Sequence, residues 1–163
     1  MQTVPEEIVE RTWREMAQMP LQEVPRIIQR MEKEQPEILG FLLGIDYDIF
    51  NQDERELLLY LGVVIWQIMM QGRPRPKRVT AKRMDQIINR TDQMAEYLMS
   101  ESEEGFEQTV EMIFKGHNQI NVLRYAVEAL FEMDDEEEQS GVREEMKGLI
   151  FMNLKTVIEA LDQ

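Results

Sequence analysis

The chain has 163 residues, of which 43% are hydrophobic and 31% are charged, and its formal net charge is −14. This length and composition predict a single soluble globular domain over residues 1–163 and exclude an intrinsically disordered chain. The absence of cysteine excludes disulfides, thiolate metal sites and a cysteine nucleophile. Since residues 1–10 are acidic and lack the apolar core of a signal peptide, we expect a cytoplasmic protein.

Three helices are predicted before residue 45. Thr3 and Glu6 have the spacing of a capping box for the first helix. Its apolar stripe is formed by Val9, Trp13 and Met16, and both Trp13 and Trp66 are interpreted as core residues. Proline is favoured in the first turn of a helix, so Pro25 and Pro36 predict where the second and third helices begin.

The strongest predicted element is a helix over residues 52–71. Asn51 and Glu54 have capping-box spacing before it. Its apolar residues occur on every side, which is typical of a central helix packed by neighbours on several faces. Its apolar run, residues 57–70, is 14 residues long and too short to cross a bilayer, so no membrane contact is expected. Gly62 is expected to permit a close helix crossing.

Helical patterns continue to the end of the chain. Glycine and prolines interrupt them at residues 72–79, and Thr80 is a candidate N-cap for the following long helix. Gly116 and Asn118 are interpreted as the C-cap and N-cap of a tight helical hairpin, and Ser140 as the start of the last helix. No strand alternation is found. The sequence therefore predicts an all-α, single-domain bundle of seven to eight helices around the 52–71 helix.

The charge is distributed unevenly along the chain. Residues 71–90 hold seven basic residues and one acidic residue, whereas the remainder holds 11 basic and 31 acidic residues. Within and beside the 72–79 connection, the candidate interaction residues are Arg73, Arg75, Lys77, Arg78, Lys82 and Arg83. The candidate acidic counter-surface, in the same chain or a second copy, is Asp134, Asp135, Glu136, Glu137 and Glu138. This pattern predicts a non-catalytic module that binds another protein, or itself, through the basic segment.

An alternative is nucleic-acid binding through the same segment. Residues 72–78, Gly-Arg-Pro-Arg-Pro-Lys-Arg, resemble an AT-hook, a short segment whose arginines lie in the minor groove of A·T-rich DNA. The resemblance implies that the prolines and arginines lie extended along the groove. The net charge of −14 opposes contact with phosphate anywhere else on the molecule.

A second alternative is a magnesium enzyme. Glu104 and Glu107, with Glu132 and Asp135, form two pairs of acids at three-residue spacing on consecutive predicted helices. The arrangement resembles the magnesium-binding pattern of the all-α nucleotide pyrophosphohydrolases, which implies hydrolysis of nucleoside triphosphates. The leading interpretation instead assigns no catalytic residue, metal or cofactor. It treats the lone His117 as a turn residue without chemistry.

Overall fold

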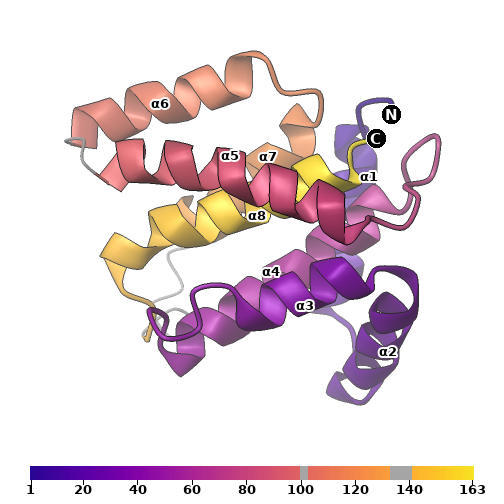
Figure 1. The fold of residues 1–163 in the computed structure, drawn as a ribbon. Helices are drawn as coiled ribbons and strands as arrows, with labels where there is room; N and C mark the ends of the chain where they lie inside the picture. The colour runs from indigo at the N-terminus through magenta and orange to yellow at the C-terminus, as the bar shows by residue number, and fades with distance from the viewer. Residues whose placement is uncertain (100–102, 133–140) are drawn as a thin grey trace.

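The computed structural model describes residues 1–99, 103–132 and 141–163, and these ranges contain eight α-helices and no strand (Figure 1). The predicted all-α bundle is confirmed. The elements are α1 (Glu6–Ala17), η1 (Leu21–Glu23), α2 (Val24–Glu34), α3 (Pro36–Gly44), α4 (Gln52–Met69), α5 (Ala81–Met99), α6 (Glu103–Lys115), α7 (Ile120–Val127), η2 (Glu128–Glu132), η3 (Glu144–Met146) and α8 (Lys147–Leu161). No helix in the described ranges combines the length and the apolar character needed to span a membrane.

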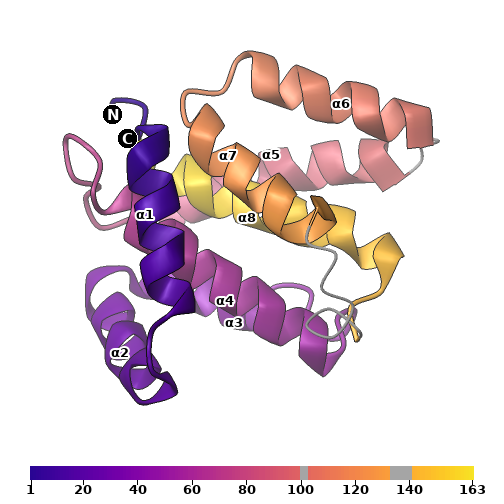
Figure 2. The same ribbon diagram turned by 180° about the vertical axis from the view of Figure 1, so that it is seen from behind.

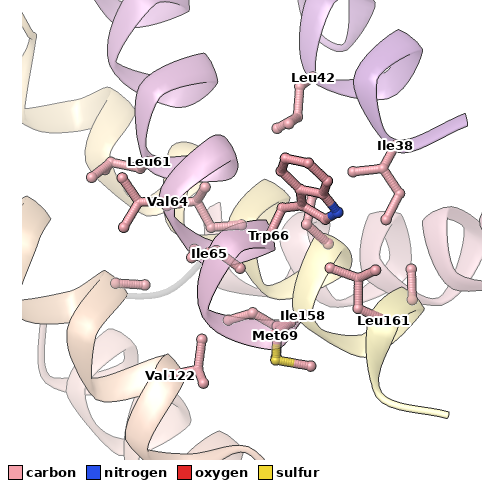
Figure 3. Close-up of a cluster of buried hydrophobic side chains, with 14 of the residues drawn as sticks. Ile38, Leu42, Leu61, Val64, Ile65, Trp66, Met69, Val122, Ile158 and Leu161 are labelled. Carbon is pink, nitrogen blue, oxygen red and sulfur yellow. The ribbon is translucent and has the colours of Figure 1, made fainter. Parts of the chain in front are cut away.

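Helix α4 lies at the centre of the bundle, as its sequence predicts. Helices α1, α2, α3, α7 and α8 all pack against it. Side chains from its different faces, among them Val64, Ile65 and Trp66, are completely buried. Figure 3 shows these side chains meeting residues of α3, α7 and α8. Because apolar area is removed from water on several faces at once, α4 contributes a large share of the hydrophobic stabilisation.

Helix α8 shares the centre with α4, and the two run side by side (Figures 1 and 2). Twelve of its 15 residues are buried, including four polar ones. The amide of Asn153 donates to Asp46 at 3.1 Å, and the hydroxyl of Thr156 donates to that of Thr91 at 3.0 Å. These partners satisfy groups whose burial would otherwise be costly, so the polar residues of α8 are part of the core.

The predicted capping box of α4 is present and has a second role. The Glu54 carboxylate accepts from the backbone N–H of Asn51 at 2.9 Å, and also from the backbone and guanidinium of Arg143. Burial alone would raise the pKa of Glu54, but the hydrogen bonds from Arg143 and the backbone lower it below its usual value. Asn51 also donates to the Gly141 carbonyl at 2.8 Å. These bonds hold residues 141–143 against α4. The next helical element is η3, which begins after the predicted helix start at Ser140. Ser140 itself lies outside the described residues.

Three local predictions are wrong for tertiary reasons. Pro5 is the N-cap of α1, and the Thr3 hydroxyl instead donates to the Asn118 carbonyl at 2.7 Å. Gln119 is the N-cap of α7, because the Asn118 side chain is turned towards the N-terminal segment. Trp13 lies at the surface with 36% of its area exposed, where the Arg14 guanidinium covers its ring.

Candidate interaction surface at the basic end of the bundle

The basic segment forms the connection between α4 and α5 and lies beside both chain ends (Figures 1 and 2). The Met1 amine donates to the Gln163 carbonyl at 2.6 Å, which brings the two ends together. The backbone N–H of Gln2 donates to the Arg73 carbonyl at 2.9 Å. Three segments that are remote in sequence therefore meet at one end of the bundle.

Two glutamine side chains hold the second half of this connection. The Gln35 amide, which is buried at the α2–α3 junction, donates to the Lys77 carbonyl at 3.0 Å and accepts from the Val79 N–H at 2.9 Å. The Gln163 amide donates to the same Lys77 carbonyl at 3.1 Å. The backbone at Lys77 and Val79 is therefore held by hydrogen bonds from two other segments, and the exposed side chains beside it are attached to an ordered backbone.

Two of the six predicted interaction residues are occupied within the chain. The Arg75 guanidinium lies 3.1 Å from the Glu34 carboxylate of α2. Arg83 donates to the carbonyls of Glu159, Ala160 and Asp162 at 2.8–3.2 Å. A cation at these last carbonyls complements the dipole of α8 and satisfies groups that the helix leaves unpaired. Arg83 is therefore a structural cap.

The other four predicted residues form what we call the basic face: Arg73, Lys77, Arg78 and Lys82. All four are exposed. None has an acidic partner among the residues that the structure describes, in contrast to Arg75. The hydroxyl of Thr80 accepts from the Arg83 N–H at 3.2 Å, so it caps α5 as predicted.

The Gly-Arg-Pro segment is packed against the protein. A Cβ atom added at Gly72 would lie 2.0 Å from the Met1 Cε atom, so the backbone and the N-terminal side chain are in close contact. Pro76 is buried, and Arg75 is paired with Glu34. This arrangement differs from the free extended segment that the AT-hook resemblance implies.

The predicted acidic counter-surface, Asp134 to Glu138, lies outside the described residues. The chain that follows it is anchored at Gly141 to the first turn of α4, whereas the basic face follows the last turn. The 18 residues of α4 span about 27 Å at 1.5 Å per residue. Whether these acids meet the basic face therefore stays a prediction.

The structure does not test the alternative magnesium site. Asp135 and the side chains of Glu104, Glu107 and Glu132 lie outside what the structure describes. Within the described part of the chain, no three side chains of the metal-ligating types gather in one place.

His117 lies in the turn before α7, as predicted, and its ring also contacts groups of α8. Its Nδ1 atom accepts from the Gln119 N–H at 3.0 Å, and its Nε2 atom lies 4.0 Å from the Glu159 carboxylate. Burial lowers the pKa of His117, and the charge of Lys155 lowers it further, while Glu159 and Asp162 oppose that shift. The lowered pKa favours the neutral imidazole, which links the α6–α7 turn to α8.

Sequence reasoning missed the amides that organise this end of the molecule. The buried Gln119 side chain donates to the Gln2 carbonyl and to Asp162, and accepts from the Val4 N–H, each at 2.9 Å. Glutamine and asparagine have no periodic signature in a sequence. Their role here depends on which segments the fold brings together.

Comparison with known proteins gives no family for this arrangement: no family model, curated protein or solved structure matches the chain.

Proposed function

We propose that this protein is a non-catalytic interaction module whose basic face binds an acidic surface of another protein. The observation that carries the proposal is the contrast between the basic face and its surroundings. Four exposed cations without acidic partners in the described structure lie on a hydrogen-bonded connection and the first turn of α5, on a chain with a net charge of −14. Such a local field attracts an acidic partner and orients its approach.

The fixed backbone supports protein recognition in preference to minor-groove binding. An AT-hook-like contact requires the prolines and the flanking arginines to enter a narrow groove together. Here Pro76 is buried and Arg75 is paired with Glu34. A broad acidic surface can contact the exposed cations from outside without displacing the connection.

A charge-reversal experiment tests the proposal. The variant Lys77→Glu/Arg78→Glu changes two exposed side chains, and Arg26→Glu/Lys33→Glu makes the same change in charge on exposed positions of α2. Both variants and the parent are used as bait in cytosolic extract at low and at moderate salt. We expect a protein that is retained by the parent and by the α2 variant but lost from the basic-face variant. Its retention should also decrease as salt screens the charges.

Two outcomes would count against this function. Equal recovery by all three baits would remove the basic face from recognition. Loss of the recovered proteins after nuclease treatment would instead favour the nucleic-acid alternative, and direct titration with an A·T-rich duplex would then distinguish DNA binding from an indirect effect.

A further inference from the structure

The first four residues of the chain are held by the turn at the start of α7. Hydrogen bonds of 2.7–2.9 Å join the two segments. They link Asn118 to the Met1 carbonyl, Gln119 to the Gln2 carbonyl and the Val4 N–H, Asn121 to the Val4 carbonyl, and the Thr3 hydroxyl to the Asn118 carbonyl. We call this set of bonds the N-terminal contact. It depends on the position of the turn, because the turn supplies most of the side chains.

His117 comes directly before these residues and supports the central one. Its Nδ1 atom accepts from the backbone N–H of Gln119 at 3.0 Å, while the buried Gln119 side chain bonds to Gln2 and Val4. A neutral imidazole can accept at one ring nitrogen, whereas a protonated imidazole carries a donor on both. Protonation of His117 therefore sets one N–H against another and breaks its bond to Gln119.

Charged groups of both signs lie on the elements around His117. They are Lys155 and Glu159 of α8, Asp162 after it, Arg83 of α5 and Lys115 at the end of α6. The Glu159 carboxylate lies 4.0 Å from Nε2 and favours a charged ring, but it is already paired with the Lys155 ammonium. Burial lowers the pKa of His117, and the charge of Lys155 lowers it further. These surroundings disfavour a proton on the ring while the N-terminal contact is in place.

We propose that His117 is a pH switch for the N-terminal contact, in which protonation of the ring releases residues 1–4 from the turn at the start of α7. Release lets the charged ring reach water, so acid favours the open form. The backbone N–H of Gln2 also donates to the Arg73 carbonyl, so opening frees the start of the connection that carries the basic face. Only this last consequence rests on the proposed function, and the switch itself is measured without any partner.

The test is amide hydrogen exchange of the parent protein, followed by nuclear magnetic resonance between about pH 8 and pH 5. We expect the protection factor of the Val4 N–H to begin to fall near about pH 6.5 and to continue down to the pKa that the His117 ring shows in the same samples. Linkage sets the size, about tenfold for each pH unit between the pKa values of the open and closed forms. The matched control is the Arg143 N–H, which donates to the Glu54 side chain at 2.9 Å and should stay protected.

Two variants assign the effect to the ring. His117→Asn keeps a side-chain acceptor near the position of Nδ1 but has no titratable ring, so Val4 protection should become independent of pH. Glu159→Gln removes a carboxylate that favours the charged ring, so it should deepen the fall in the parent background. This second variant decides the matter if His117→Asn does not fold.

Val4 protection that is independent of pH in the parent would overturn the proposal. So would a fall that persists unchanged in folded His117→Asn, or one that Glu159→Gln leaves unaltered. None of these results would affect binding through the basic face, which the charge-reversal variants measure separately.

Discussion

At the scale of single residues, neighbouring charged groups in this protein have different roles because their surroundings differ. Arg83 is fixed by three carbonyls at the end of α8, whereas Lys82, next to it in sequence, is exposed on the basic face. Residue type and spacing do not distinguish these two cations. Only the position of the α8 terminus does.

His117 allows the clearest prediction at this scale, since it is the chain's single histidine. Burial lowers its pKa in the folded state, so the unfolded chain takes up the proton first as the pH falls. The stability contributed by neutral His117 should therefore be complete above the unfolded pKa of about 6.5 and be lost as the pH decreases towards the folded value. Protonation would also remove the acceptor that the Gln119 N–H uses.

Nuclear magnetic resonance of the only imidazole measures this directly. We expect a pKa below about 6.5 in the folded protein and a return towards that value in urea. Glu159→Gln should lower the folded pKa further, because it removes a carboxylate that favours the charged form. A folded pKa at or above the unfolded value would contradict the structure around His117.

At the scale of helices, the packing of α3 on α4 depends on a glycine. A Cβ atom added at Gly62 would lie 2.5 Å from Leu42 Cδ1 and 3.1 Å from its Cγ atom, so the close crossing expected from the sequence is observed. Leu42 is 3% exposed and surrounded by other core side chains. A methyl group at position 62 would therefore have to displace the Leu42 side chain from its packed position.

Substitutions of two glycines by alanine test this crossing. Gly40→Ala on α3 has no atom within 4 Å of the new Cβ, and should stabilise the protein by about 0.5–1 kcal/mol through helix propensity. Gly62→Ala gains the same propensity but introduces overpacking that costs about 1–3 kcal/mol, so a net loss is expected. Urea unfolding measures both changes. Equal stabilisation by the two variants would show that the crossing is looser than described.

At the scale of the whole molecule, charge is separated along α4. Exposed acids gather near its beginning, at Asp48, Asp53, Glu56, Glu144 and Glu145, and the basic face follows its end. The net charge of the whole molecule is −14. Repulsion among the acids opposes the folded state more than the unfolded chain, because folding brings the charges closer together.

Salt should therefore stabilise the protein near neutral pH. We expect the melting temperature to rise as sodium chloride is added at low ionic strength, by about 2–4 °C for each kcal/mol of repulsion that is screened. Differential scanning calorimetry provides the measurement. The control is the same series near the isoelectric point of about 4.5, where the net charge is small and the rise should disappear. A decrease in melting temperature at neutral pH would mean that the screened attractions outweigh the repulsion.

The sequence by itself determined the helical class, the central position of α4, its capping box and the break at residues 72–79. These features depend on local propensity and on the 3.6-residue periodicity, which neighbouring residues along the chain establish. It also located the basic segment, because the charge of a segment is independent of its conformation.

Only the tertiary structure decided which of those cations are available and how α8 is buried. Arg75 and Arg83 are occupied by groups more than 40 residues away in sequence, and Gln35, Gln119 and Gln163 become important through contacts of the same kind. The same holds for Trp13, which shares an apolar stripe with Val9 but remains 36% exposed while Val9 is buried. Periodicity indicates which face of a helix is apolar, whereas burial and pairing require a partner segment, and the fold alone supplies that partner.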